Sequence, residues 1–259
     1  MDTYTNDQKQ YMSRMNQTAQ NKFDLLKQHL TANAKVLDFG SGYSPDFIEA
    51  VVQTGASYTA YDSSPIVQEK LRTNGIDLLS EEELLSSKER FDIVFLSSVF
   101  HELVSYLSPD KYKQTLDTLV GILKSGGLLI VRDWVNPNDD SISTITLKAK
   151  TKQVFTWIDA LESNNIFKQV VTKGDTLYAS QRDMYQIVFH AVWGLGSLER
   201  ESKETYDVTD AIGSLSLTYG LMLVSYHAEY DESYLEHIKK YFSTRTLPFA
   251  TKGIWVFRK

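Results

Sequence analysis

The chain has 259 residues, of which 42% are hydrophobic and 23% charged, so it is long enough to bury one sizeable core. Its net charge of -6 argues against wholesale electrostatic binding to DNA or to anionic membranes. The absence of cysteine excludes disulfides, thiolate catalysis and cysteine-ligated zinc or iron–sulfur centres. The first residues are polar, and no apolar run reaches the roughly 18 residues of a membrane span. We therefore expect a cytoplasmic protein with no membrane partner.

The first half of the chain alternates short apolar runs with amphipathic segments. Residues 7–30 predict a helix with Asn6 as its N-cap. Strands are predicted over 35–40, 57–62, 76–79, 91–98 and 128–135. Helices that each begin with Ser-Pro are predicted over 44–55, 64–75 and 108–127, the first closed by Gly55 and the last by Gly126 and Gly127.

Residues 138–200 interrupt this alternation. They predict a helix over 144–163, a turn at Lys173-Gly174-Asp175 and then a polar, aromatic, largely helical stretch. The alternation resumes with helices at 205–220 and 232–242 and strands at 221–230 and 253–259. The pattern predicts an α/β protein with a doubly wound, mostly parallel, seven-stranded Rossmann-like sheet and a helical insertion, or cap, after strand five.

The stretch VLDFGSGYSP, residues 36–45, runs from a buried strand through an acid into a glycine-rich turn. Gly40 and Gly42 allow the backbone to turn tightly and to approach a ligand without Cβ interference. A dinucleotide carries a pyrophosphate that favours a third glycine at the helix start, where this chain has Ser44. In doubly wound sheets, ligands bind outside the carboxyl ends of the strands. The turn therefore predicts a ligand site that is not built for a pyrophosphate.

Three later segments complete a pattern with this turn. They are the acid Asp62 at the end of the second strand, FDIVFLSS at 91–98, and LKSGGLLIV at 123–131, with Ser125 in a position where proline is usual. In this order the segments resemble the class I S-adenosylmethionine-dependent methyltransferases, well over residues 35–135 and loosely over the last 50. The resemblance implies S-adenosylmethionine as cofactor and methyl transfer as the reaction.

The resemblance also implies roles for single residues. The backbone of Gly40 and Gly42 would face the methionine end of the cofactor, and Asp38 would orient the loop or meet the amino group. Asp62 would accept hydrogen bonds from both ribose hydroxyls. For Asp38 and Asp62 the alternative is strand-end capping. Further expected cofactor contacts are Ser41, Ser63, Ser97, Ser98 and Glu81.

The stretch SEEELL follows the third strand, where the family contacts the adenine. Ser80, Glu81 or Glu82 would make this contact. A solvated helix start is an equally good interpretation of any one of them.

Two catalytic candidates follow strand four, and a third ends strand five. His101 and Glu102 are expected to contact the acceptor or take its proton, because a histidine with a pKa near neutrality suits that role. The alternative for His101 is packing under the following helix. His-Glu resembles the start of a zinc motif, but residue 105 is serine, so no metal is expected. Asp133 is the third catalytic candidate, and its neighbour Arg132 is a candidate for acceptor binding.

The insertion carries an unusual polar and aromatic cluster. We expect it to form a lid that binds the acceptor, because tryptophan and tyrosine suit stacking and arginine suits an anion. The acceptor-binding candidates are Arg182, Tyr185, His190, Trp193 and Arg200. They favour a nucleotide-like, RNA-related or other small anionic planar acceptor, either a small molecule or a structured nucleic acid. The alternative is a solvated helical cap with its own small core.

These expectations divide the chain into four parts: an N-terminal helical cap (1–34), a cofactor-binding core (35–136), the insertion (137–200), and helix–strand units that complete the sheet (201–259). Two other functions stay open from sequence. One is a nucleotide-binding oxidoreductase, against which Ser44 argues. The other is a non-catalytic, cofactor-binding subunit of a methyltransferase complex. The sequence names neither the methylated atom nor the oligomeric state.

Overall fold

The computed structural model describes residues 16, 18–86, 90–136, 139–148, 152–167, 170–191, 193, 195–230, 232–243 and 250–259. The expected N-cap Asn6 and the first part of the expected N-terminal helix lie outside these residues. What is described of that helix is α2 (Ala19–Leu26), which continues into the 3-10 helix η1 (Lys27–His29). None of the described helices is long and apolar enough to cross a membrane.

Seven strands form the main sheet, in the order β3-β2-β1-β4-β5-β10-β9. Their bounds are β1 (Lys35–Phe39), β2 (Ser57–Tyr61), β3 (Asp77–Leu78), β4 (Phe91–Ser97), β5 (Leu123–Trp134), β9 (Met222–Glu229) and β10 (Lys252–Arg258). The first five run parallel, and β10 runs antiparallel to both of its neighbours. The predicted doubly wound, mostly parallel sheet is confirmed. The strand order reverses between β1 and β4, which is where such sheets bind ligands.

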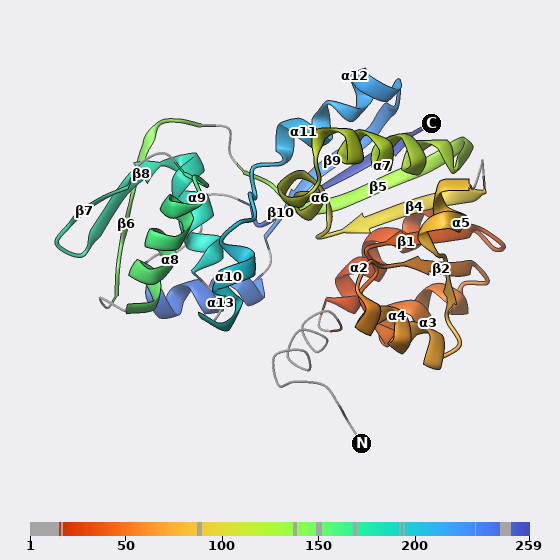
Figure 1. Ribbon diagram of the computed structural model, residues 1–259, viewed down its shortest axis with the longest axis horizontal. Helices are drawn as coiled ribbons and strands as arrows, with labels where there is room; N and C mark the ends of the chain where they lie inside the picture. Colours follow the sequence, from red (N-terminus) through yellow and green to blue (C-terminus); the bar gives the residue numbers. More distant parts are fainter. Residues whose placement is uncertain are drawn as a thin grey trace.

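Helices cover both faces of this sheet (Figure 1). One face packs on α2, α3 (Pro45–Gln53) and α4 (Pro65–Thr73), and the other on α5 (Glu81–Ser86), α6 (Phe100–Tyr106), α7 (Pro109–Gly121), α11 (Thr209–Gly213) and α12 (Leu215–Tyr219). Proline occupies the first turn of α3, α4 and α7, as the Ser-Pro pairs predict. Strand β4 is buried along nearly its whole length, as a central parallel strand must be.

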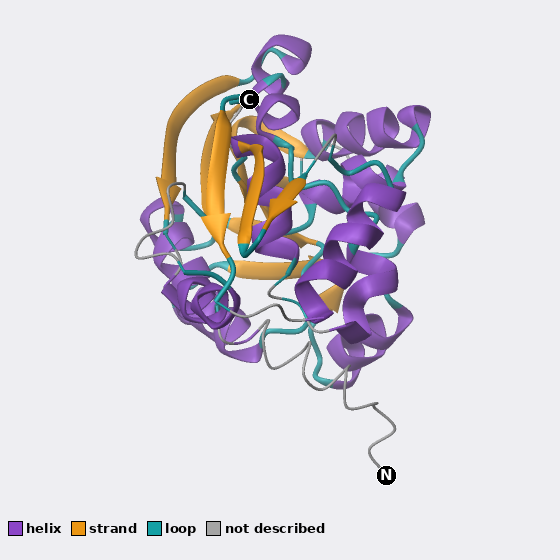
Figure 2. Ribbon diagram, turned by 90° about the vertical axis from the view of Figure 1, so that its left-hand side faces the viewer, coloured by secondary structure: helices purple, strands orange, loops and turns teal. Residues whose placement is uncertain are grey.

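The insertion differs from the predicted helical cap, because it contains a second sheet. Strands β6 (Ile142–Thr146), β8 (Thr176–Ser180) and β7 (Val171–Lys173) form an antiparallel sheet in that order, seen from its own side in Figure 2. The helix expected over 144–163 begins only at Lys152, as α8 (Lys152–Ser163), because the β-branched stretch before it pairs as a strand. The predicted turn is confirmed, with Gly174 at φ +62° between β7 and β8.

A third hydrophobic core lies inside this part of the molecule. Helices α8, α9 (Gln181–His190) and α13 (Glu232–Tyr241) contribute to it, with η2 (Leu195–Ser197) and α10 (Leu198–Glu201) nearby (Figure 1). Helix α13 supplies Ile238, and Phe242 directly after it is also in this core. The segment at 232–242, which we expected to complete the main sheet, therefore packs against the insertion.

Two predicted helix ends also differ. The helix expected over 205–220 is two short helices, α11 and α12. Helix α7 ends at Gly121 rather than at the glycine pair, because the chain has already entered β5 at Leu123. Gly126, at φ +77°, lies where the register between β4 and β5 shifts.

Candidate active site

The glycine-rich turn after β1 is a tight structure that favours glycine. Gly40 and Gly42 have φ of +70° and +58°, in the left-handed region. The N–H of Gly40 donates to the carbonyl of Tyr61 at 2.8 Å, which holds the turn against the end of β2. A Cβ on Gly40 would lie 2.5 Å from Cγ2 of Val99, in the loop after β4. The turn is therefore closely fitted to the ends of both neighbouring strands.

Asp62 ties this turn to the start of α4. Its Oδ2 accepts a hydrogen bond from the N–H of Gly42, and its Oδ1 accepts one from the N–H of Ser64, both at 2.8 Å. Burial raises the pKa of Asp62, and the two backbone N–H groups oppose that rise. Each carboxylate oxygen can accept a second hydrogen bond. Asp62 thus caps backbone N–H groups at the end of β2, which was the alternative interpretation. Its contact with the ribose stays a prediction, and the spare acceptor capacity of both oxygens permits it. Ser63 beside it is exposed, whereas Ser41 is buried in the turn.

A buried pair of opposite charges lies beneath the turn. Asp38 accepts a 2.7 Å hydrogen bond from the hydroxyl of Tyr58. Burial raises the pKa of Asp38 to about 6, although the nearby Lys22 ammonium opposes this. Burial in turn lowers the pKa of Lys22 to about 8. Close to the same edge, the buried Ser97 Oγ at the end of β4 has no hydrogen-bond partner among the described residues.

Sequence reasoning missed Lys22. The signal was present, because Lys22 lies three and four residues before Leu25 and Leu26, on the buried face of α2. A lysine on the apolar face of a helix calls for a charged partner, which is here Asp38.

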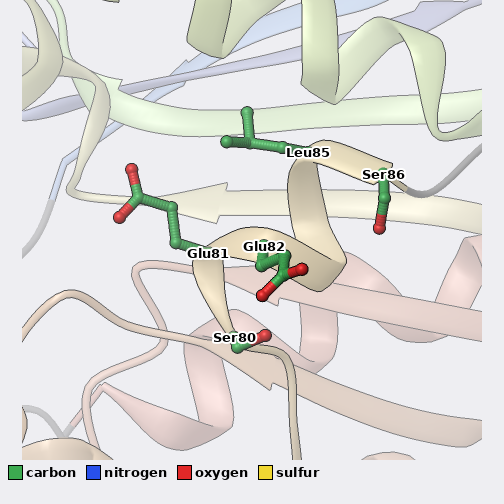
Figure 3. Close-up of a pocket in the computed structure, with 5 residues that line it drawn as sticks. All are labelled: Ser80, Glu81, Glu82, Leu85 and Ser86. Carbon is green, nitrogen blue, oxygen red and sulfur yellow. The ribbon is translucent and has the colours of Figure 1, made fainter.

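The stretch after β3 is a capped helix start, as the second of its two interpretations predicted. Ser80 and Glu83 form a capping box: the N–H of Ser80 donates to Oε2 of Glu83 at 2.8 Å, and the N–H of Glu83 donates to Oγ of Ser80 at 3.2 Å. A shallow, open hollow of about 730 Å³ on the surface is lined by Ser80, Glu81, Glu82, Leu85 and Ser86 (Figure 3). Burial and the neighbouring charge of Glu81 raise the pKa of Tyr61 at the end of β2. Glu81 therefore lies close enough to Tyr61 for its charge to act there, and its adenine contact stays a prediction.

The carboxyl end of β4 carries a second unusual backbone position. Ser98 has φ +58°, a conformation that costs a non-glycine residue free energy. Its Oγ lies 3.0 Å from the Nζ of Lys252, the first residue of β10. The same ammonium lies 3.5 Å from the ring centroid of Trp134, a cation–π contact. Lys252 is buried, and sequence reasoning did not identify it.

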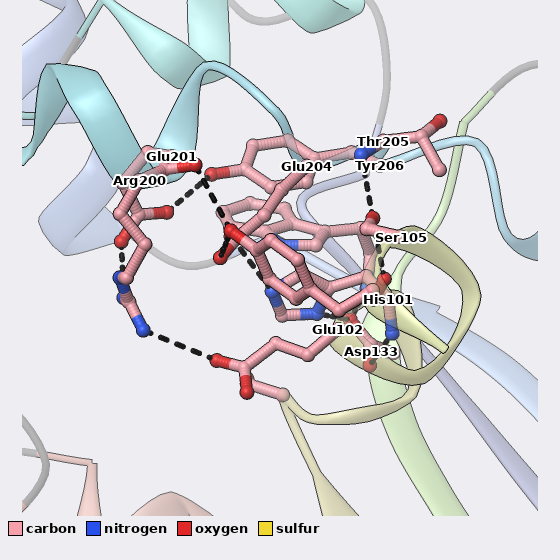
Figure 4. A network of polar contacts seen from close by, with 12 residues as sticks. His101, Glu102, Ser105, Asp133, Arg200, Glu201, Glu204, Thr205 and Tyr206 are labelled. Carbon is pink, nitrogen blue, oxygen red and sulfur yellow. Dashed lines mark hydrogen bonds and ion pairs between the residues drawn. The ribbon is translucent and has the colours of Figure 1, made fainter. Parts of the chain in front are cut away.

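Two of the three catalytic candidates, His101 and Asp133, are in direct contact (Figure 4). Nδ1 of His101 lies 2.8 Å from Oδ1 of Asp133, and the N–H of His101 donates to Oδ2 of the same carboxylate at 3.1 Å. On its other side, Nε2 of His101 forms an ion pair at 3.4 Å with Oε2 of Glu204. Burial alone would lower the pKa of His101, but these two carboxylates raise it to about 10.

This arrangement changes the expected role of His101. An imidazole between two buried carboxylates is held as the imidazolium, so it has no free lone pair with which to take a proton at neutral pH. The pKa near neutrality that we expected from sequence does not describe this histidine. Sequence reasoning also missed Glu204, which carries no motif and reaches His101 only through the fold.

Further contacts join α6 to the chain that leaves the insertion (Figure 4). The Tyr106 Oη lies 2.9 Å from Oε1 of Glu204. The N–H of Thr205 donates to Oγ of Ser105 at 2.9 Å. Of the two predicted residues here, Arg200 forms an ion pair with Glu102 at 3.5 Å. The structure thus brings the expected Glu102 and Arg200 together beside His101.

The other predicted acceptor residues of the insertion lie elsewhere. Tyr185 and His190 are completely buried in the third core, with the hydroxyl of Tyr185 donating to the carbonyl of Thr251 at 3.0 Å. Trp193 is half-buried and donates through Nε1 to the hydroxyl of Tyr206 at 2.8 Å. Tyr185 and His190 therefore present no open ring face, whereas Trp193 is partly exposed and its acceptor contact stays a prediction.

The two remaining arginines are held by acids. Arg182 forms an ion pair with Asp207 at 3.6 Å. Arg132 is buried and donates through Nε to Oε1 of Glu229 at 2.9 Å, which ties β5 to the end of β9. Their expected acceptor contacts stay predictions.

Comparison with known proteins identifies a protein family that this chain matches. A family model described as a methyltransferase domain matches residues 11–170. The tRNA N(3)-methylcytidine methyltransferase trm140 of Schizosaccharomyces pombe is 30% identical over 110 residues, which are 42% of this chain and 31% of that protein. The chain thus matches less than a third of that relative's length.

Solved structures share the fold at low sequence identity. An S-adenosylmethionine-dependent methyltransferase from Mesorhizobium loti superposes with a TM-score of 0.54 at 14% identity, covering 91% of this chain and 96% of that one. The 1,6-didemethyltoxoflavin-N1-methyltransferase of Burkholderia thailandensis, bound to 1,6-didemethyltoxoflavin and S-adenosylhomocysteine, gives 0.51 at 14% identity over 94% of this chain and 79% of its own. These likenesses support the arrangement of strands and helices described above.

Proposed function

The chain belongs to the class I S-adenosylmethionine-dependent methyltransferases, and we propose that it methylates a ring nitrogen of a nucleotide-like acceptor, an RNA base above all. The observation that carries the cofactor assignment is the Gly40–Gly42 turn, in which the N–H of Gly42 donates to Oδ2 of Asp62. The observation that carries the acceptor class is the contact of both ring nitrogens of His101 with buried carboxylates, those of Asp133 and Glu204.

The residues at the sheet edge fit the cofactor chemically. The methionine end of S-adenosylmethionine is a zwitterion, and the buried Asp38 and Lys22 supply one charge of each sign beneath the turn. The unpartnered Ser97 Oγ offers a further polar contact there. Asp62 retains acceptor capacity for the ribose, and Glu81, which lies near Tyr61, is on the side where we expect the adenine.

When bound, the cofactor supplies an electrophilic methyl group on a sulfonium. What this chain must add is alignment of the acceptor and a suitable electrostatic environment. His101 is paired on both sides and cannot remove a proton, so the arrangement favours an acceptor atom that already has a free electron pair. A neutral ring nitrogen has one. Methylation makes that ring positively charged, so no proton has to be removed from the acceptor.

RNA is favoured by one further finding. The partial relative from Schizosaccharomyces pombe is named for methylation of tRNA at N(3) of cytidine, which is a ring nitrogen with a free electron pair. The match covers part of each chain, so the tRNA itself comes to this protein as a proposal. The cytoplasmic location expected from composition likewise stays a proposal.

We also propose that the insertion acts as a lid over the acceptor. Its exit segment contacts α6 through Glu204, Thr205 and Arg200, and α6 begins directly after the β4 end. An acceptor at that edge would lie between α6 and the insertion. In this proposal the half-exposed Arg200 and Tyr106 face the acceptor, in place of the buried Tyr185 and His190.

The two alternatives predict different binding behaviour. An oxidoreductase would bind NAD(H), whereas we expect heat on titration with S-adenosylmethionine and none with NAD(H). Asp62→Ala should weaken S-adenosylmethionine binding at least tenfold, because a hydrogen bond to a charged group is worth about 1.5–3 kcal/mol. Asp77→Ala, in β3 at the far sheet edge, is the matched control and should bind normally. Equal affinity in both variants would overturn the cofactor site.

The acceptor is tested with methyl-labelled S-adenosylmethionine and three pools: total tRNA, nucleoside monophosphates, and small amines with carboxylates. We expect label in tRNA, on a base nitrogen after digestion to nucleosides. Label on hydroxyl or carboxylate oxygens would contradict the proposed acceptor class. Cofactor binding without label in any pool would favour the non-catalytic subunit.

A further inference from the structure

Lys252 is a buried lysine at the carboxyl edge of the main sheet. It is the first residue of β10, is 2% exposed, and lies opposite Trp134 in the ladder with β5. Because β10 runs antiparallel to β5, its first residue lies beside the last residues of β5. Lysine is almost never buried this deeply unless its ammonium is paired. The fold therefore holds a positive charge at the same edge of the sheet as the glycine-rich turn after β1.

The partners of this ammonium fix its position. It donates a hydrogen bond to the Oγ of Ser98 at 3.0 Å, and it lies 3.5 Å from the ring centroid of Trp134. Its charge also acts on Asp133. Burial raises the pKa of Asp133, but the charge of His101 and then that of Lys252 lower it to about 2.

The backbone that carries Lys252 is anchored on two sides. The N–H of Thr251, the preceding residue, donates to the carbonyl of Glu229 at 2.9 Å, at the end of β9. The carbonyl of Thr251 accepts from the hydroxyl of Tyr185 in the insertion at 3.0 Å. Lys252 thus extends from a point that is fixed to both the sheet and the insertion.

Ser98, the residue that accepts from this ammonium, has a strained backbone. Its φ of +58° lies in the left-handed region, which costs serine free energy and which glycine adopts without that cost. Two hydrogen bonds hold it there. Its N–H donates to the carbonyl of Arg132 at 2.7 Å, and its Oγ accepts from Lys252. Strain of this kind persists only where the surrounding structure holds the residue in place.

The residues on either side of Ser98 lie at the cofactor site. Val99 follows it, and the Cγ2 of Val99 lies 2.5 Å from the place that a Cβ on Gly40 would occupy. Ser97 precedes it, and the buried Oγ of Ser97 has no hydrogen-bond partner among the described residues. The conformation of Ser98 therefore sets how the loop 97–99 meets the turn after β1.

We propose that Lys252 is a positioning residue for methyl transfer: its ammonium holds Ser98 in the left-handed conformation, and Ser98 in turn orients the loop 97–99 against the Gly40 turn. This role rests on the proposed function, because the loop matters to the reaction only if the cofactor binds at that turn. In this role Lys252 acts through Ser98 and contacts neither the cofactor nor the acceptor. Loss of the ammonium should loosen the loop, weaken cofactor binding and slow methyl transfer.

Two substitutions of Ser98 separate its conformation from its hydrogen bond. Ser98→Ala loses the bond from Lys252 and keeps the strain, whereas Ser98→Gly loses both. In calorimetric titrations with S-adenosylhomocysteine, Ser98→Ala should bind about fivefold more weakly than Ser98→Gly, a difference of about 1 kcal/mol. Equal affinities of the two variants would overturn the proposal, because the conformation of Ser98 would then not matter.

Substitution of Lys252 tests the same role from the other side. Lys252→Met keeps an unbranched side chain over Trp134 and removes the charge. It should weaken S-adenosylhomocysteine binding about fivefold, and Ser98→Gly added to it should restore most of the affinity, because glycine needs no ammonium to hold a positive φ. Lys113→Met is the matched control and should bind as the wild type does, since Lys113 pairs with Asp117 at 2.7 Å on the surface of α7.

A double variant that binds no better than Lys252→Met would overturn the proposal. The melting temperature shows whether Lys252→Met folds, and if it does not, the comparison of the two Ser98 variants decides. With total tRNA and saturating cofactor, kcat should fall in Lys252→Met and recover in the double variant. A wild type that binds S-adenosylhomocysteine but labels no tRNA contradicts the proposed acceptor alone, and the binding comparisons still decide the role of Lys252. A wild type that does not bind S-adenosylhomocysteine overturns both.

Discussion

At the scale of single residues, the neighbours of His101 decide its chemistry. The sequence places His101 and Asp133 after adjacent strands, and the structure joins them at 2.8 Å. Glu204 converts this pair into a carboxylate–imidazolium–carboxylate arrangement. Because Glu204 approaches through tertiary packing alone, no local spacing in the sequence predicts that His101 is charged.

Removing one member of this arrangement should be costly. Asp133→Asn should lower the free energy of unfolding by about 3–5 kcal/mol, since it leaves a buried imidazolium poorly compensated. Asp92→Asn is the control: Asp92 pairs with Lys124 at 2.8 Å on the surface, and its loss should cost about 0–1 kcal/mol. Urea unfolding measures both. Similar losses in the two variants would contradict the buried ion pair.

The same pair predicts a pH dependence with a definite sign. The pKa of His101 is raised from 6.5 to about 10, so its stabilising contribution is complete below pH 6.5 and is lost as the pH rises through 10. The pKa of Asp133 is lowered, so its contribution is present above its unfolded value of 3.8 and is lost only in strong acid. The stability difference between wild type and a His101→Gln/Asp133→Asn double variant should shrink from pH 7 to pH 10. A difference that stays constant over this range would show that His101 is neutral.

At the scale of elements, the sequence predicts the strands and helices between β1 and β5 well and those of the insertion poorly. Strands β1, β2 and β4 are short apolar runs, and the Ser-Pro pairs mark the starts of α3, α4 and α7, so local signals fix their bounds. The stretch 142–146 reads as the start of a helix because an amphipathic helix follows it closely. Helix α13 shows an apolar face, but periodicity does not reveal that this face packs against the insertion.

The β1–α3 turn offers a matched pair of glycine substitutions. Gly40 and Gly75 both have φ +70°, but a Cβ on Gly75 meets nothing within 4 Å, whereas one on Gly40 meets Val99 at 2.5 Å. Gly75→Ala should cost about 1–2 kcal/mol from backbone strain alone. Gly40→Ala should cost about 1–3 kcal/mol more and weaken cofactor binding. Thermal unfolding and calorimetry compare them, and equal stability would contradict the close fit of the turn.

Tyr185 tests how the insertion is attached to the sheet. Its hydroxyl accepts from the N–H of Val135 at 3.1 Å and donates to the carbonyl of Thr251 at 3.0 Å. Tyr185→Phe should lower stability by about 1–3 kcal/mol, because it leaves buried backbone groups without this partner. Tyr178→Phe in β8 is the control and should change stability by less than about 0.5 kcal/mol. An equal loss of stability in the two variants would show that the hydrogen bonds of the Tyr185 hydroxyl do not stabilise the attachment of the insertion.

At the scale of the whole molecule, two well-packed parts meet at the carboxyl edge of the main sheet. Four motifs in order predict the fold and the cofactor, because their residues form backbone turns and strand ends. They lie at 36–44, 62, 91–98 and 123–131. The acceptor site is less predictable, because aromatic and charged residues serve a core as readily as a binding surface. Tyr185 and His190 are the examples: their residue types suit an acceptor, and the fold uses them to pack the insertion.

Product stoichiometry tests the central claim, S-adenosylmethionine-dependent methyl transfer to a nucleotide-like acceptor. Purified protein is incubated with trideuteromethyl-labelled S-adenosylmethionine and tRNA, and mass spectrometry counts S-adenosylhomocysteine and labelled nucleosides. We predict equal amounts of the two, with the label on a base nitrogen, and a fall of at least tenfold in Asp62→Ala at limiting cofactor. No S-adenosylhomocysteine above background in the wild type with tRNA or nucleotides, or equal amounts in wild type and Asp62→Ala, would contradict the account.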